Sequence, residues 1–222
     1  MAGNLGGTIS LGDLMQHGSC GIGTFDGLDG EVVILDNEVY QADSTGAVHH
    51  VTDDQVTLPF ASVHQPADLT ALSLDRVDFA ALNQDFVARH ELTNVFAALR
   101  LHGTVEDITV RVAPKQGRPY PSLLEVAKGQ PTFHRDRVSG TIIGYFAPAI
   151  FGTVTAAGWH LHFLSDDRQF AGHLLSFSAP HLTGDLQVFN QLDQHFPVAD
   201  AEFRRGKVDA ARLQEQIAQA EG

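Results

Sequence analysis

Short β-prone runs separated by glycine-rich turns constrain the fold of this chain most. Within the first sixty residues, three such runs occupy residues 21–25, 31–35 and 38–41. The pairs Asp29-Gly30 and Asp36-Asn37 lie between these runs, and residue pairs of this kind favour the tight turns of β-hairpins. The pattern therefore predicts a β-meander at the start of the chain.

Helical spacing occurs in only a few places. Apolar residues recur at helical intervals over residues 75–90, and Ser73 or Asp75 could cap the first turn of this helix. A short helix is expected over residues 121–129, which carry proline near the start and glycine at the end. The alanine-, glutamine- and glutamate-rich residues 209–220 predict a third helix.

The rest of the chain has strand character. Strands are expected within residues 94–112, on both sides of a His102-Gly103 turn. After Pro131 the β-prone runs are residues 140–146, 154–164, 173–178 and 186–189. We predict an α/β fold of the α+β type, with two packed β-sheet lobes and a few helices. Residues 1–130 would form an N-terminal mixed sheet, and residues 131–222 a C-terminal antiparallel sheet with a metal site and a terminal helix or tail.

Composition excludes several classes of protein. The 222 residues include 14 basic and 27 acidic side chains, a net charge of -13 that repels nucleic acid. No apolar stretch approaches the roughly 20 residues of a membrane span, and no secretory signal opens the sequence, so we expect a cytoplasmic protein without a membrane partner. Cys20 is the only cysteine, which excludes an internal disulfide and a thiolate metal cluster.

Histidine is the residue type that points to chemistry, with 12 in the chain. His160 and His162 flank Leu161 in a β-prone run, and side chains two apart in a strand share one face. His173 follows after a polar segment, and an antiparallel return of the chain would bring it beside the pair. Three neutral imidazoles on one sheet face would bind Zn²⁺ or a similar divalent ion and leave positions open for substrate.

Other interpretations of these residues stay open. A cupin would also carry a His-x-His pair, followed a few residues later by a carboxylate, and Asp166 and Asp167 lie at that spacing but within a turn. Such an enzyme would act on another keto or hydroxy acid. A zinc-stabilised β domain without catalytic activity is the second alternative. The glycine-rich residues 21–27 have neither dinucleotide-binding spacing nor the ligand pattern of a calcium loop.

Several separated motifs together resemble the α-acetolactate decarboxylase family. They are residues 18–31, Arg118-Pro119-Tyr120-Pro121, residues 140–144, residues 159–163 and Gly172-His173. The resemblance runs in order from about Leu11 to the end of the chain. It departs from the family at Cys20, where an aromatic residue is expected, and at Ser139, where an arginine can occur.

The resemblance implies a metal-dependent lyase, active as a homodimer. It would convert the small anionic substrate (S)-2-acetolactate to (R)-acetoin and CO₂. Its cofactor would be Zn²⁺, held by His160, His162 and His173. The zinc ion would stabilise the negative charge that develops on the ketone oxygen.

The resemblance also assigns three catalytic residues. Glu31 closes the Leu-Asp-Gly-Glu motif and would donate the proton that replaces CO₂. Arg111 would pair with the substrate carboxylate through its guanidinium fork. Glu221, near the end of the chain, would assist at the site or ligate the metal.

Overall fold

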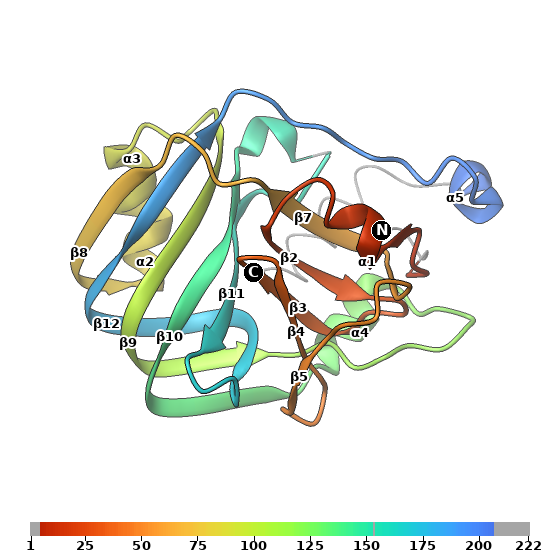
Figure 1. Cartoon of the computed structure of the whole chain (residues 1–222), viewed down its shortest axis with the longest axis horizontal. Helices are drawn as coiled ribbons and strands as arrows, with labels where there is room; N and C mark the ends of the chain where they lie inside the picture. The colour runs from red at the N-terminus through yellow and green to blue at the C-terminus, as the bar shows by residue number, and fades with distance from the viewer. Residues whose placement is uncertain (1–4, 153, 207–222) are drawn as a thin grey trace.

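A computed structural model describes residues 5–152 and 154–206 of the chain. Two five-stranded β-sheets form most of this structure, with short helices beside them (Figure 1). The predicted α+β fold with two packed sheets is therefore confirmed. A further two-stranded sheet joins β1 (Ile9–Ser10) to β6 (Thr57–Leu58).

The N-terminal sheet has the strand order β5-β4-β3-β2-β7. Its strands are β2 (Cys20–Phe25), β3 (Asp29–Leu35), β4 (Glu38–Ala42), β5 (Val48–His50) and β7 (Phe60–His64). All of their pairings are antiparallel, which corrects the prediction of a mixed sheet. Short turns explain this: Asp36 and Asn37 have φ of 52° and 69°, the left-handed backbone of a two-residue hairpin turn.

The large sheet has the strand order β11-β10-β9-β12-β8. Its strands are β8 (Thr70–Asp78), β9 (Phe96–Arg111), β10 (Thr132–Ala147), β11 (Gly158–Ser165) and β12 (Ala171–Phe189). These pairings are antiparallel, as predicted for the C-terminal sheet. The beginning of β12 pairs with β11 as well as with β9, so the sheet folds back on itself at this end.

Two strands are longer than the sequence predicts. β9 continues through His102 and Gly103, where a turn was expected. A Cβ at Gly103 would lie 2.9 Å from the carbonyl oxygen of His181 in β12, so glycine here permits a close approach of two strands. β12 likewise joins the two runs predicted at residues 173–178 and 186–189 into one strand.

The division between the sheets also differs from the predicted boundary at residue 130. β8 and β9 precede that residue, yet they belong to the same sheet as β10, β11 and β12. The change from one sheet to the other falls between β7 and β8, at residues 65–69. Long antiparallel pairing of β9 with β10 is the physical reason, because it extends the large sheet across the expected boundary.

The helix expected over residues 75–90 begins later, at Phe79. It consists of α2 (Phe79–Ala81), the π-helical turn η1 (Leu82–Phe86) and α3 (Val87–Arg89). The carboxylate of Asp78 caps it by accepting a hydrogen bond from the Ala81 amide at 2.8 Å. Asp75 cannot be the cap, because it lies in β8 opposite His181.

The other helices are short. They are α1 (Leu11–Leu14), α4 (Leu123–Lys128), the 3₁₀ turn η2 (Ala149–Phe151) and α5 (Ala201–Arg205). α4 confirms the helix predicted within residues 121–129, and a capping box between Ser122 and Glu125 fixes its start. The helix predicted over residues 209–220 lies outside the described residues.

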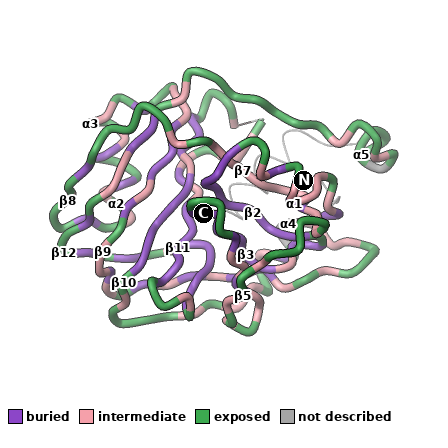
Figure 2. Tube along the Cα trace, in the orientation of Figure 1, coloured by how far each residue is buried: buried purple, intermediate pink, exposed green. Residues whose placement is uncertain are grey.

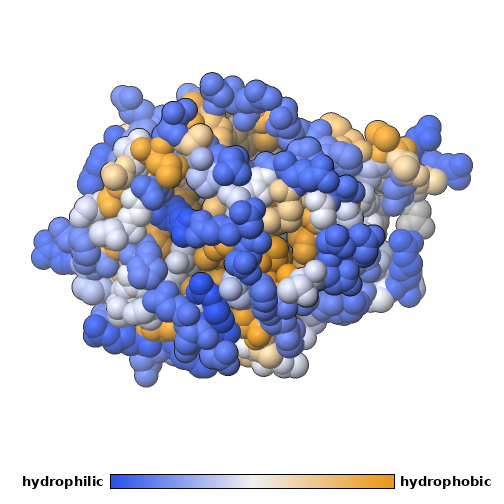
Figure 3. Space-filling view, viewed as in Figure 1, coloured by the Kyte–Doolittle hydropathy of each residue, from blue (hydrophilic) through white to orange (hydrophobic). Residues whose placement is uncertain are grey.

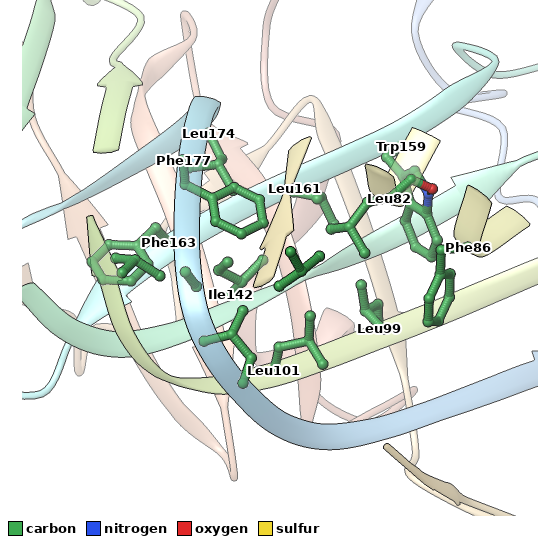
Figure 4. Packing of buried hydrophobic residues seen from close by; sticks show 14 of the residues in the cluster. Leu82, Phe86, Leu99, Leu101, Ile142, Trp159, Leu161, Phe163, Leu174 and Phe177 are labelled. Atoms are coloured by element: carbon green, nitrogen blue, oxygen red, sulfur yellow. The ribbon is translucent and has the colours of Figure 1, made fainter. Parts of the chain in front are cut away.

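The strands of both sheets contain long buried stretches (Figure 2), and buried hydrophobic residues form separate clusters. One cluster fills the space between this sheet and the helix at residues 79–89, and includes Trp159, Leu161 and Phe163 of β11 (Figure 4). A second cluster lies between the two sheets and includes Val33 of β3 and Leu164 of β11. The two sheets are therefore held together by apolar packing beside the end where the large sheet folds back.

The face of the molecule shown in Figure 3 is mostly hydrophilic, in line with the high net charge. Apolar side chains are nevertheless exposed along the extended segment that leads to α5, among them Leu192, Phe196 and Val198. No helix in the described ranges is both long and apolar enough to cross a membrane.

The half-buried His64 should make folding stability depend on pH. Its Nδ1 lies 2.8 Å from the Tyr145 hydroxyl, and burial lowers the pKa of the imidazole from 6.5 to about 4. Between these values the unfolded chain binds the proton more readily, so the His64 contribution to stability is lost as the pH falls from 6.5 towards 4. Urea unfolding across this range should show a weaker pH dependence for His64→Gln than for the unaltered chain.

The exposed His17 provides the control, since His17→Gln should retain the pH dependence of the unaltered chain. An equal pH dependence in His64→Gln and the unaltered chain would contradict this account of His64.

Candidate metal centre

β11 presents two histidines on the face of the large sheet that meets the N-terminal sheet. Alternation along the strand places His160 and His162 on this face, while Leu161 and Phe163 point into the core on the other side (Figure 4). His162 is fully buried, and His160 is partly buried. The apolar residues between and beside the histidines therefore fix which way both imidazoles point.

His173 joins this pair from β12. A tight turn reverses the chain after β11, where the Ser165 hydroxyl accepts a hydrogen bond from the Phe170 amide at 2.9 Å. The register then sets His162 directly opposite His173. Ligand atoms of the three predicted metal ligands, His160, His162 and His173, all lie within 4.8 Å of one another. The structure thus brings together three side chains that could hold one metal ion.

The hydrogen bonding of His162 fits a metal ligand. Its Nδ1 donates to the carbonyl oxygen of Val32 in β3, at 2.9 Å. This bond places the proton on Nδ1 and leaves a lone pair on Nε2. Nε2 is buried and makes no hydrogen bond. A buried nitrogen without a partner is costly, and a cation held between the three rings would supply its partner.

The charge state of the three imidazoles also suits ligation. Burial, together with the Arg111 guanidinium, lowers the pKa of His160 to about 4. Burial likewise holds the pKa of His162 and of His173 well below the usual value of 6.5. All three rings are therefore neutral near pH 7, and neutral imidazole is the form that binds divalent metal ions.

Glu31 reaches the same place from the N-terminal sheet. It lies on β3, and its side chain is almost fully buried. One carboxylate oxygen, Oε1, accepts a hydrogen bond from the Ala113 amide at 3.1 Å. The other, Oε2, lies 3.3 Å from Nε2 of His162, although the two atoms are not aligned as a hydrogen bond. The predicted catalytic carboxylate thus borders the histidine cluster.

Arg111 borders the cluster at His173. It is the last residue of β9 and lies directly opposite His173 in β12. Its Nη2 is 3.2 Å from Nε2 of His173. A guanidinium is always charged, so this contact brings a positive charge to the edge of a group of neutral rings.

The two carboxylates of the cupin alternative do not join the cluster. Asp166 contacts His102 at 3.1 Å, and Asp167 accepts hydrogen bonds from Ser165 and Gln169 within the turn. Neither carboxylate therefore supplies the cupin-type ligand. Glu221 lies outside the described residues.

Three groups that contact or border the histidines could not be identified from the sequence. Two are backbone groups, the carbonyl of Val32 and the amide of Ala113, which any residue type could supply. The third is the ring of Phe60, which stacks on the ring of His160. Only the packing of the two sheets reveals these contacts.

Comparison with known proteins assigns the chain to a family. The family model of alpha-acetolactate decarboxylase matches residues 1–210. The chain belongs to this family. It is 34% identical to the enzyme of that name from Lactococcus lactis subsp. cremoris over 223 residues, which cover all of this chain and 93% of the relative. The Streptococcus thermophilus relative is 35% identical over 226 residues, with the same coverage.

Solved structures of the alpha-acetolactate decarboxylase family have the same fold. The Bacillus subtilis enzyme superposes with a TM-score of 0.93 at 28% identity, and the match covers 99% of this chain and 94% of that chain. A Staphylococcus aureus protein, described as similar to alpha-acetolactate decarboxylase, superposes with a TM-score of 0.94 at 33% identity, covering 100% of this chain and 95% of that chain. The chain is therefore a decarboxylase with the fold of this family.

Replacing a predicted ligand should weaken metal binding. His162→Ala leaves two imidazoles, so the dissociation constant for Zn²⁺ should rise by about 100-fold or more. Competition with a chromophoric chelator measures this value, and circular dichroism reports whether the variant is folded. His160→Ala, at a less buried position, should give the same result.

His102→Ala is the control, because His102 is an exposed residue of the same sheet whose side chain contacts Asp166. It should bind Zn²⁺ like the unaltered chain. A folded His160→Ala or His162→Ala variant with undiminished zinc affinity would contradict the proposed site.

Proposed function

We propose that this chain decarboxylates (S)-2-acetolactate to (R)-acetoin and CO₂, with Zn²⁺ held by His160, His162 and His173. One observation supports this proposal most. The three imidazoles, a buried carboxylate and a guanidinium converge on one place from four strands of two sheets. In a chain of the alpha-acetolactate decarboxylase family, this set matches the demands of the reaction.

The reaction breaks one carbon–carbon bond and forms one carbon–hydrogen bond. When CO₂ leaves, the electron pair of the broken bond moves towards the neighbouring ketone, and an enediolate results. A proton then adds to the carbon that carried the carboxylate. Zn²⁺, when bound, would supply Lewis acidity that stabilises the negative charge developing on oxygen. The remaining tasks are to orient the carboxylate, to exclude water and to deliver the proton.

Arg111 suits the first of these tasks. Its position beside His173 places a permanent positive charge next to the proposed metal ligands. A guanidinium can bind a carboxylate through two parallel hydrogen bonds, which would fix the direction of the bond that breaks. The rest of the chain is acidic, with a net charge of -13. A local positive charge is therefore needed to attract an anionic substrate.

Glu31 suits the delivery of the proton. The hydrogen bond from the Ala113 amide holds Oε1, so the orientation of the carboxyl group is fixed and Oε2 faces the histidines. A protonated Oε2 could donate to one face of the enediolate carbon. We propose that Glu221 assists from the end of the chain, a role that rests on the resemblance alone.

The surroundings of the cluster favour such a reaction. Apolar residues fill the space between the sheets next to the histidines, among them Val33, Ile143 and Ala171. A site with little water strengthens every electrostatic interaction within it. The packing that holds the sheets together therefore also lowers the polarity around the proposed reaction.

We propose further that the enzyme acts as a homodimer in the cytoplasm. The resemblance supports this assembly. The exposed apolar residues Leu192, Phe196 and Val198 offer surface that a second copy could cover.

The function is tested by incubating the zinc-loaded protein with racemic acetolactate. Acetoin and CO₂ should form in equal amounts, well above the rate without protein, and no oxygen should be consumed. A chelator should stop the reaction, and added Zn²⁺ should restore it. A folded, zinc-loaded protein that released no acetoin would overturn the proposal, and oxygen uptake would favour the cupin-like alternative.

Replacing Glu31 by glutamine should separate proton delivery from folding and metal binding. The amide oxygen of glutamine can still accept the hydrogen bond from Ala113, but the side chain cannot donate a carboxylic proton. Turnover should fall by about 100-fold or more, with zinc content and thermal unfolding close to those of the unaltered chain.

Glu38→Gln is the matched control, since Glu38 is an exposed glutamate on the neighbouring strand β4. It should leave turnover unchanged. If Glu31→Gln turned over acetolactate as fast as this control, Glu31 would not be the proton donor.

A further inference from the structure

The rings of the three predicted ligands contact different neighbours. His162 is fixed by its hydrogen bond to the Val32 carbonyl, and His173 is in contact with the Arg111 guanidinium. His160 is the least buried of the three. Its ring lies parallel to the ring of Phe60, with the two ring centres 5.5 Å apart and the planes 7° from parallel. A separation of this size between parallel rings is an offset stack, one of the favoured aromatic geometries.

Phe60 comes from the other sheet, so its position depends on how the two sheets pack. It begins β7 and lies opposite Thr24 of β2. The preceding Pro59 lies between Leu58 of the two-stranded sheet and Phe60 of the N-terminal sheet. Proline fixes its own φ and donates no backbone hydrogen bond. The chain thus changes sheet at Pro59, directly before the residue whose ring stacks on His160 of β11.

The same face of β7 makes a second contact with the large sheet. Four residues after Phe60, the ring of His64 meets the ring of Tyr145 edge-on, at 5.5 Å between centres. Tyr145 lies directly opposite His160 in the pairing of β10 with β11. The rings at both ends of β7 therefore contact the large sheet at or beside His160. These two contacts fix the position of Phe60 relative to His160.

We infer that Phe60 is a positioning residue for metal binding, holding the His160 imidazole by stacking in the orientation required to ligate the ion. Rotation about the bond between Cβ and the ring is soft for histidine, because this torsion has broad energy wells. A flat ring packed against the imidazole restricts that rotation before the metal arrives. Less freedom is then lost on binding, which increases affinity. This inference rests on the proposed metal site.

The test compares zinc affinity in variants that keep or remove the aromatic ring. Phe60→Leu keeps an apolar side chain but removes the stack, so the dissociation constant for Zn²⁺ should rise by about fivefold. Phe60→Tyr keeps the ring and should remain within about twofold of the unaltered chain. Chelator competition measures these constants, and thermal unfolding of the metal-free proteins reports their stability. Phe60→Met replaces the leucine variant if that variant does not fold.

Phe96→Leu is the matched control. Phe96 is another half-buried aromatic residue at the beginning of a strand, and its ring lies 5.0 Å from that of Phe151. This variant loses a similar contact elsewhere and should bind zinc normally. Co²⁺ in place of Zn²⁺ adds a spectroscopic readout. Its visible absorption should change in Phe60→Leu but not in Phe60→Tyr or Phe96→Leu, because it reports ligand geometry.

Two results would overturn the inference while leaving the metal site intact. In the first, the unaltered chain binds zinc and Phe60→Leu has a dissociation constant within about twofold of it. Only the role of Phe60 is then refuted. In the second, Phe60→Tyr binds as weakly as Phe60→Leu, so the ring is not what matters. Absence of zinc binding by the unaltered chain would instead refute the metal site itself, and the role of Phe60 with it.

Discussion

The pairing of β12 with two strands at once determines the geometry of the site. His173, near the beginning of β12, lies opposite His162 of β11 and also opposite Arg111 of β9. Neither pairing alone would bring the Arg111 guanidinium near His160 and His162 of β11, because β9 and β11 are otherwise separated by β10. Folding the sheet back on itself therefore assembles the histidine cluster and its neighbouring charge through backbone hydrogen bonds, which are rigid and hold side chains in fixed register.

The N-terminal sheet supplies the other groups that surround the three histidines. It supplies the carboxylate of Glu31, the carbonyl of Val32 that orients His162, and the ring of Phe60 that covers His160. The two sheets meet through apolar side chains, so the same packing that stabilises the fold also sets these contacts and keeps the imidazoles neutral. Damage to the interface between the sheets should therefore affect the site even when no residue of the site is changed.

Much of this could be predicted from the sequence where the signal is local. Strand alternation places His160 and His162 on one face, and an antiparallel return places His173 beside them. The positions of Glu31 and Arg111 followed from resemblance to a family and not from local pattern. Glu31 precedes His162 by more than a hundred residues, and no propensity encodes such a contact. Their catalytic roles, and that of Glu221, stay proposals.

The errors in prediction have a common physical cause. Gly103 was interpreted as a turn residue, yet it lies within β9, where the absence of a side chain lets β12 approach closely. The long strands that result belong to one sheet on both sides of the expected boundary at residue 130. The contact of Phe60 with His160 was missed for a related reason, because it depends on how two separate sheets pack. Glycine and aromatic residues have several structural uses, and tertiary packing decides among them.

The most direct measurement is a crystal structure of the zinc-loaded protein, with diffraction data collected on both sides of the zinc absorption edge. The account predicts one strong anomalous peak per chain, bonded to nitrogen atoms of His160, His162 and His173 at about 2.0–2.1 Å, with Glu31 and Arg111 beside it. A fully loaded crystal with its zinc peak elsewhere, and with no metal between these three rings, would contradict it.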